Sequence, residues 1–216
     1  MTDALREASP ALLFLPGAGG NTALWRPVSA GLSHTGRRHF FSWPGFAGAP
    51  PDPTVRGIDD LVARVVREIS GPVVLFAQSM GGLVALRAAL AVPHRIRALV
   101  LSVTSGGLDL AALGAVDWRP QFEQHNPHAP RWFLDARDDL APQLAQIFAP
   151  VLLLWGDTDP ISPVKVGQRL AQLLPDAELV VIPGGTHDLA SERASEVLPH
   201  IERHLERALR PAVDRG

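Results

Sequence analysis

The sequence contains no cysteine. Disulfide bonds, thiolate metal sites, iron–sulfur clusters and thiol nucleophiles are therefore excluded for these residues. Neither sign of charge is in excess, because 20 Lys and Arg residues oppose 22 Asp and Glu residues and the formal net charge is −2. This balance argues against electrostatic binding to nucleic acid or to an anionic membrane, so neither partner is expected.

Long apolar runs are scarce as well. The apolar run nearest the N-terminus covers only Ala11 to Leu15 and is not preceded by the basic region of a signal peptide. A membrane span needs about 20 consecutive apolar residues, and no stretch approaches that length. We therefore expect neither a signal peptide nor a membrane span, and the expected location is the cytoplasm.

The remaining composition is that of an ordinary globular protein, with 46% hydrophobic and 19% charged residues. A length of 216 residues fits one domain. No internal repeat or linker divides the chain, so residues 1–216 are predicted to fold as a single domain. The oligomeric state does not follow from the sequence.

Short apolar runs closed by Gly, Pro or Asp organise the chain. Each run is too short for a normal helix and lacks polar alternation, which is typical of strands that are buried on both faces. These runs are residues 11–17, 37–45, 72–79, 96–107, 150–157 and 178–185. Helix-period segments cover residues 58–69, 81–92, 164–174 and 191–208. The last segment contains Pro199, which should kink or split it.

This alternation of strands and helices predicts an α/β fold around a parallel sheet, with ligand chemistry at the carboxyl ends of the strands. One interval, from about residue 104 to 148, contains no strand-like run. It carries the large aromatic residues Trp118, Phe122, Trp132 and Phe133 and four prolines, and an insertion of this length is typical of a lid or a binding element. We predict a short helical lid here; the alternative is a surface excursion that covers one edge of the sheet.

The motif FAQSMGG, residues 76–82, follows one predicted strand and opens a predicted helix. A serine at such a tight turn projects its hydroxyl above the edge of the sheet. The turn requires small residues two positions before and after the serine, and Ala77 and Gly81 stand there. Ser79 is therefore a candidate nucleophile, although a serine beside glycines often marks only the start of a helix.

Later strands are followed by an acidic residue and a histidine. The run that ends at residue 157 is followed by a loop that offers Asp157 and Asp159, for which the alternative role is turn formation. His187 comes just after the last predicted strand, where a lone histidine is usually a solvated surface group. Together the three residue types stand at strand ends in the order Ser, Asp, His. This order predicts a nucleophile, an acid and a base at one edge of the sheet.

The chain resembles the α/β-hydrolase superfamily over nearly all of residues 11–208. The segments that carry the resemblance are LPGAGG, WPGFAG, AQSMGG, WGDTDPISP and GGTHDLA. The family places its acid three residues after the glycine that ends the strand, which selects Asp159 over Asp157. The resemblance thus implies Ser79 as nucleophile, His187 as base and Asp159 as the acid that orients the base.

An oxyanion hole is implied by the same resemblance. It would be formed by the backbone N–H groups of Met80, after the nucleophile, and Ala18, in the loop after the first strand. The chain departs from the family in having Pro16-Gly17 where His-Gly is frequent, and residues 42–49 lack the usual Asp and Ser. The antiparallel strands that often precede the parallel core have no room before residue 11, so we expect a reduced, mostly parallel sheet of about six strands.

Other residues are weaker candidates. Five aromatic residues are proposed to line an apolar pocket, and each has the core as its alternative place: Trp25, Phe46, Trp118, Phe122 and Trp132. His125 and His128 are separated by a proline that prevents helical spacing, and the charged neighbours of His200 and His204 predict a solvated helix face. Neither pair is expected to bind a metal, and no cofactor is expected. Asp188 is expected to face away from His187 or to cap a helix.

The resemblance implies a serine hydrolase that cleaves a small carboxylic ester through an acyl-enzyme. An acyl thioesterase is an alternative, because LPGAGG followed by a tryptophan-containing helix start is similar to type II thioesterases. A C–C hydrolase or lyase on the same scaffold and a non-catalytic ligand receptor that keeps the triad are further alternatives. The expected partner is a small acyl ester or thioester.

Overall fold

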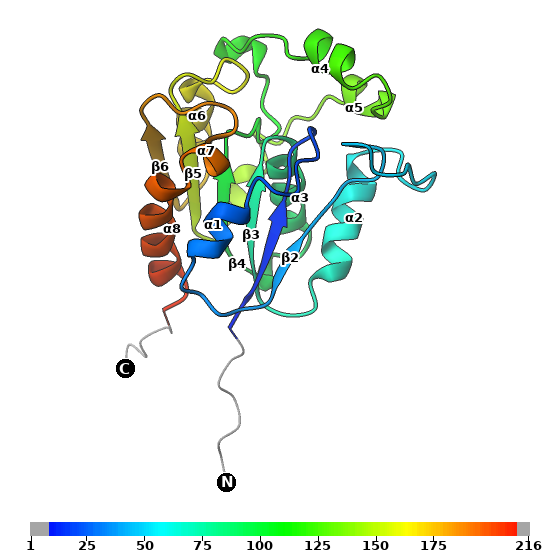
Figure 1. The fold of residues 1–216 in the computed structure, drawn as a ribbon. Helices are drawn as coiled ribbons and strands as arrows, with labels where there is room; N and C mark the ends of the chain where they lie inside the picture. The colour runs from blue at the N-terminus through cyan, green and yellow to red at the C-terminus, as the bar shows by residue number, and fades with distance from the viewer. Residues whose placement is uncertain (1–8, 211–216) are drawn as a thin grey trace.

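A computed structural model describes residues 9–210, so residues 1–8 and 211–216 of the predicted domain lie outside the description. Its centre is a six-stranded sheet in the order β2-β1-β3-β4-β5-β6 (Figure 1). The strands are β1 (Ala11–Leu15), β2 (Arg38–Phe40), β3 (Val73–Gln78), β4 (Ile96–Ser102), β5 (Val151–Gly156) and β6 (Ala177–Ile182). Every neighbouring pair is parallel, which confirms the predicted reduced sheet.

Helices cover both faces of this sheet (Figure 1). One face packs against α2 (Ile58–Glu68), α3 (Met80–Ala91) and α6 (Val164–Leu173). The other face packs against α1 (Arg26–Gly31), α7 (Leu189–Glu192) and α8 (Ala194–Ala208). Successive residues of a strand point to opposite faces. In β1, for example, Leu13 packs with the first group and Leu12 with the second, so the strand is a continuous apolar run.

Several predicted boundaries need correction. The run 37–45 forms a strand only at Arg38–Phe40, because Gly45 and Gly48 adopt positive φ angles in the turns that follow. The six-residue helix α1 was not predicted, since a segment this short shows little periodicity. The last predicted helix is interrupted at Arg193 rather than at Pro199, which lies inside a continuous α8.

The order of the strands leaves a crevice at the carboxyl ends of β1 and β3. From β1 the chain passes to one face of the sheet and from β3 to the other, and ligands bind at such a switch point in open α/β sheets. The residues of the interval 104–148, here called the cap segment, include α4 (Arg119–His125) and α5 (Arg131–Asp135). Both helices lie above the carboxyl ends of the strands (Figure 1).

The shorter helical turns of the described chain are 3₁₀ segments at Pro93–Arg95, Ala111–Leu113 and Leu144–Gln146. Two of the three belong to the cap segment, which is therefore built from short helical pieces without any strand of its own. Between residues 9 and 210, no helix is both long enough and apolar enough to cross a membrane.

Candidate active site

Ser79 occupies the sharp turn between β3 and α3. Its φ of 52° and ψ of −122° lie in a region that residues with a side chain rarely adopt. Three hydrogen bonds hold the turn: the Ser79 N–H donates to the carbonyl of Ser102 (3.0 Å), and the Ser79 carbonyl accepts from the Gly82 N–H (3.0 Å) and the Thr104 hydroxyl (2.6 Å). The strained turn is thus fixed by neighbours in β4, α3 and the segment after β4.

Close packing requires a glycine at position 81, two residues after Ser79. A Cβ atom at Gly81 would lie 2.6 Å from the carbonyl oxygen of Pro16 and 2.8 Å from that of Leu15, closer than any real Cβ contact. The first turn of α3 therefore packs directly on the end of β1. Ala77, two residues before Ser79, is completely buried in the same packing. The Ala-x-Ser-x-Gly pattern fits this turn without further adjustment.

Asp159 and His187 come together from the loops after β5 and β6. Asp159 Oδ2 lies 2.7 Å from His187 Nδ1, and the Asp159 side chain has no exposed surface. The other oxygen, Oδ1, accepts a hydrogen bond from the Ile161 N–H (2.8 Å). With Nδ1 directed at a carboxylate, neutral His187 carries its proton there and leaves Nε2 as a proton acceptor.

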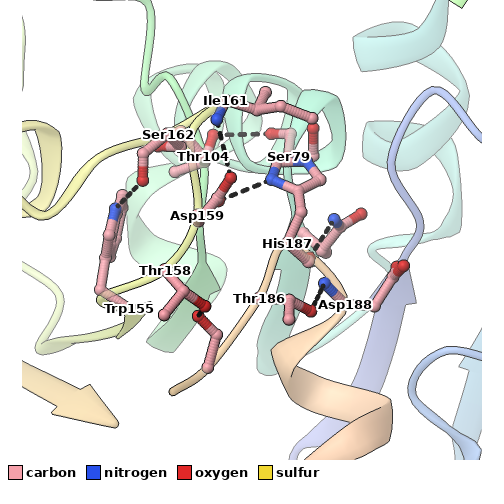
Figure 2. A network of polar contacts seen from close by, with 12 residues as sticks. Ser79, Thr104, Trp155, Thr158, Asp159, Ile161, Ser162, Thr186, His187 and Asp188 are labelled. Carbon is pink, nitrogen blue, oxygen red and sulfur yellow. Dashed lines mark hydrogen bonds and ion pairs between the residues drawn. The ribbon is translucent and has the colours of Figure 1, made fainter. Parts of the chain in front are cut away.

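Figure 2 shows Ser79, His187 and Asp159 close together at the carboxyl edge of the sheet. Ser79 and His187 both line one cavity. Among residues 9–210, no hydrogen bond joins the Ser79 hydroxyl to the imidazole. Such bonds are often long in a free enzyme and shorten when substrate binds. The arrangement is compatible with proton transfer from the hydroxyl to the imidazole.

The two other carboxylates near His187 have different partners. Asp157 is exposed and its Oδ1 accepts a hydrogen bond from the Gly184 N–H (2.6 Å), so it holds the loop after β6. Asp188 is exposed and precedes α7, where its carbonyl accepts from the Ser191 N–H (3.0 Å). Within residues 9–210, neither carboxylate forms a hydrogen bond or ion pair with the His187 ring.

The two expected oxyanion donors are near Ser79 in the structure. Ala18 and Met80 both line the cavity. Within residues 9–210, neither N–H donates to a protein acceptor, so both are free for a ligand. The loop that carries Ala18 approaches the nucleophile closely, because a Cβ atom at Gly17 would lie 3.0 Å from the Cβ of Ser79. A glycine at position 17 permits this approach.

A polar network connects the loop of Asp159 with the turn of Ser79 (Figure 2). The Trp155 indole N–H donates to the Ser162 carbonyl (2.9 Å), and the Ser162 hydroxyl donates to the Thr104 carbonyl (3.2 Å). The Thr104 hydroxyl in turn donates to Ser79, as described above. The role of Thr104 was not predicted from the sequence. The available signal was a small polar residue two positions after a largely apolar strand.

The cavity above Ser79 has a volume of about 770 Å³. One side is formed by the loops after β1 and β3, and the cap segment forms much of the other side. Two of the five aromatic candidates, Trp118 and Phe122, line it, and Phe133 lies beside them with ring-centroid distances of 5.1 and 5.4 Å. All three rings line the cavity, and together they are here called the aromatic wall. A cavity of this size is typical of a site for a small organic ligand.

The other three aromatic candidates do not line this cavity. Trp25 is 1% exposed and packs on Phe14 and Phe76, on the face of the sheet covered by α1 and α8. Phe46 is also buried, and Trp132 packs edge-on against it with the ring centroids 5.9 Å apart. Trp25 and Phe46 therefore belong to the core, and the half-buried Trp132 packs against it, which was the alternative placement.

The histidine pairs also need one correction. His125 and His128 are exposed, and His125 also lines the cavity. His204, in contrast, is 1% exposed, so it lies on the buried side of α8 and not on a solvated helix face. Burial, and secondarily the nearby Arg207, lower the pKa of His204 to about 4. In the part of the chain that the structure describes, no group of three or more His, Asp or Glu side chains could hold a metal ion.

Comparisons with known proteins agree with this architecture. A family model described as "Alpha/beta hydrolase family" matches residues 12–143, and one described as "alpha/beta hydrolase fold" matches residues 112–194. A pimeloyl-[acyl-carrier protein] methyl ester esterase from Aliivibrio salmonicida (strain LFI1238) is 23% identical over 240 residues, covering 90% of this chain and 92% of the relative.

Two solved structures share the fold. A membrane phospholipase A, described as a bacterial virulence factor, matches with a TM-score of 0.78 and 21% identity over 95% of this chain and 81% of its own. A thermophilic esterase from Thermogutta terrifontis matches with a TM-score of 0.73 and 19% identity over 93% of this chain and 91% of its own. These two structures therefore have the same overall fold as this chain.

Proposed function

Since the chain belongs to the α/β-hydrolase family and is a hydrolase, we propose that it cleaves a small carboxylic ester through Ser79, His187 and Asp159. The observation that carries the proposal is the buried 2.7 Å contact between Asp159 and His187 beside Ser79. A carboxylate without exposed surface that binds one imidazole nitrogen fixes the tautomer and the orientation of the ring. Ser79 stands on a strained turn next to that ring.

The reaction would proceed in two halves. In the first, His187 Nε2 accepts the hydroxyl proton of Ser79 while Oγ attacks the ester carbonyl carbon, and the carbonyl electron pair moves to oxygen. As the tetrahedral intermediate collapses, the ester C–O bond breaks and His187 gives the proton to the leaving alcohol. In the second half, water attacks the acyl-Ser79 ester with the same proton transfers, which releases the acid and regenerates the hydroxyl.

The N–H groups of Ala18 and Met80 would bind the negatively charged oxygen of the tetrahedral intermediate. Preorganised donors of this kind contribute about 3–4 kcal/mol each to the stabilisation of the transition state. Both donors belong to backbone that is held before substrate arrives, one by close packing of the Gly17 loop and the other by the first turn of α3. Little reorganisation would be needed during the reaction.

The substrate would present an apolar group to the aromatic wall. Trp118, Phe122 and Phe133 form an apolar surface in the cap segment, and the cavity volume of about 770 Å³ accommodates an acyl chain of several carbons with its leaving group. The relative from Aliivibrio salmonicida is named as a methyl ester esterase, which supports an oxygen ester over a thioester. We therefore propose a short-chain alcohol ester of a medium-length carboxylic acid.

A substrate panel tests this proposal. Methyl esters and thioesters of the same acyl groups, from two to about ten carbons, are compared for kcat/KM with the wild type and with Ser79→Ala. The proposal expects the highest kcat/KM for an oxygen ester and loss of turnover in Ser79→Ala. Higher kcat/KM for every thioester than for its matched ester would instead assign a thioesterase.

The same panel separates an enzyme from a ligand receptor that keeps the triad. An enzyme releases many equivalents of product per active site. Release of a single equivalent, followed by a stable acyl adduct on Ser79, would contradict the hydrolase proposal and identify a receptor. Intact-protein mass after each reaction distinguishes the two outcomes directly.

A further inference from the structure

Resting on the proposed function, we propose that Gln78 is a positioning residue for the general base, and that its side-chain amide holds the main chain of His187 beside the nucleophile. Gln78 is the last residue of β3 and immediately precedes Ser79. Its Nε2 donates a hydrogen bond to the main-chain carbonyl of His187 at 3.0 Å, across 109 residues of sequence.

Gln78 is an unusual residue for its place. The side chain is 4% exposed, and every other residue of β3, from Val73 to Ala77, is apolar and buried. Burial of a primary amide costs free energy unless hydrogen bonds replace the lost water. An apolar residue would suit this strand better if packing alone were required. The hydrogen bond to His187 compensates the Gln78 N–H group for its loss of water.

The amide also occupies a space that a neighbouring glycine provides. A Cβ atom at Gly17 would lie 3.2 Å from Gln78 Cδ and would overlap Oε1. The Gln78 amide therefore packs against the backbone of the loop that carries the oxyanion donor Ala18. The side chain of the residue directly before the nucleophile thus contacts both the loop of the oxyanion hole and the loop of the base.

His187 is held at two points, and the two act on different parts of the residue. Asp159 binds the ring at Nδ1 and sets its orientation, whereas Gln78 binds the main chain. Among residues 9–210, the bond from Gln78 is the single hydrogen bond made by the main chain of His187. The remaining contacts between the loops after β5 and β6 lie earlier in the chain, at Gly184 and Gly185.

Loss of the Gln78 hydrogen bond would let His187 shift away from Ser79, although the imidazole would still be present. Proton transfer needs Nε2 within hydrogen-bond reach of the serine hydroxyl, and a misplacement of about 1 Å can lower a rate roughly 100-fold. Gln78 lines the cavity beside Ser79, but it is not part of the aromatic wall that would contact the apolar group of the substrate, so binding of the substrate should change little. The expected signature is a lower kcat with an unchanged KM.

The primary test is Gln78→Met, which keeps the length of the side chain and removes the donor. We expect kcat per titrated active site to fall about 10-fold with KM within about two-fold of wild type. Gln168→Met is the matched control, because Gln168 is exposed on α6 and makes no side-chain hydrogen bond within residues 9–210. Gln78→Asn, whose shorter amide cannot span the same distance, replaces Gln78→Met if the latter does not fold.

A double-mutant cycle shows whether Gln78 acts through the base. In a His187→Ala background no base remains to be positioned, so Gln78→Met should leave the residual rate unchanged. An equal loss of rate in both backgrounds would overturn the proposal, because Gln78 would then act on Ser79 or on the oxyanion loop. A wild-type kcat in Gln78→Met would overturn it as well.

Failure of the proposed function gives a different result. If His187 is not the base, His187→Ala retains most of the activity, whatever the effect of Gln78→Met. If His187 is the base and Gln78 does not position it, His187→Ala is inactive while Gln78→Met in the wild-type background keeps its kcat. The two failures are therefore distinguished by the single mutants alone.

Discussion

Asp159 Oδ2 lies 2.7 Å from His187 Nδ1 with its side chain fully buried, whereas Asp157, two residues earlier, accepts a hydrogen bond from the main-chain N–H of Gly184. The carboxylates thus hold the same loop in different ways. Asp159 contacts the ring that would carry the proton. Asp157 acts on the backbone three residues before that ring.

This difference predicts unequal effects of the two Asn variants. Asp159→Asn should lower kcat by roughly 10⁴-fold, because the amide favours the wrong tautomer of His187. Asp157→Asn should cost less than about 10-fold, since its amide oxygen can still accept the Gly184 N–H bond. Steady-state kinetics of both variants measure the ranking. The reverse ranking would show that the acid is Asp157.

The loop beside the nucleophile gives a second prediction. Gly17→Ala should lower kcat roughly 100-fold, because the new Cβ would press on Ser79 and Gln78 and displace the donor at Ala18. Gly19→Ala is the control, since a Cβ there has no atom within 4 Å. The measurement is kcat for both variants with one ester. Equal activities would argue against an oxyanion donor in this loop.

The aromatic residues of the cap segment divide into two groups. Trp118 and Phe122 line the cavity, so Trp118→Ala and Phe122→Ala should change the acyl-chain preference by about 1–3 kcal/mol in relative kcat/KM. Trp132 lies outside the cavity and packs on Phe46, so Trp132→Ala should lower the melting temperature without a change in preference. Chain-length series and thermal melts on the three variants test both statements. An altered preference in Trp132→Ala alone would contradict the assignment of the aromatic wall.

His204 predicts a pH dependence of stability. Its folded-state pKa of about 4 lies below the ordinary value of 6.5, chiefly because of burial and then because of Arg207, while Glu178 and Asp176 act in the opposite direction. The unfolded chain therefore binds a proton at this residue below about pH 6.5, and the folded chain does not until about pH 4. Its contribution to stability is complete above pH 6.5 and is lost as the pH falls from 6.5 to 4.

Denaturant unfolding at pH 8 and pH 5 measures this effect. Between these values the wild type should lose about 2 kcal/mol through His204, and His204→Leu should lose correspondingly less. His94→Leu, which removes an exposed histidine, should behave like the wild type. The same pH dependence in His204→Leu and in the wild type would rule out this residue as the cause.

The fold could be predicted from the sequence because strands buried on both faces are continuous apolar runs. Val73–Gln78 and Val151–Gly156 are buried along their whole length, so their apolar runs coincide with the strands. The proximity of Ser79, Asp159 and His187 in space then follows from the topology, since the carboxyl ends of parallel strands lie at one edge of the sheet. For these residues, the sequence pattern that predicts a strand end also indicates where the side chain lies in the fold.

The cap segment and the single side chains were harder to predict. Whether an aromatic ring faces a cavity or the core depends on the direction of short helices such as α1 and α5, which periodicity does not reveal in six or fewer residues. His204 is different, because it lies three residues after Ile201 and seven after Val197, both buried. The burial of His204 could have been inferred from this spacing, but its charged neighbours dominated the interpretation.

The most direct test of the account is covalent labelling of the nucleophile. A fluorophosphonate probe should add one equivalent per chain, and peptide mapping should place it on Ser79. Ser105 is the internal control, because it also lines the cavity but does not stand on the strained turn between β3 and α3, and its hydroxyl accepts a hydrogen bond from the Gly107 N–H (3.3 Å). Ser79→Ala should abolish labelling and Ser105→Ala should leave it intact. Stoichiometric labelling of Ser105, or of any residue in Ser79→Ala, would contradict the proposed site.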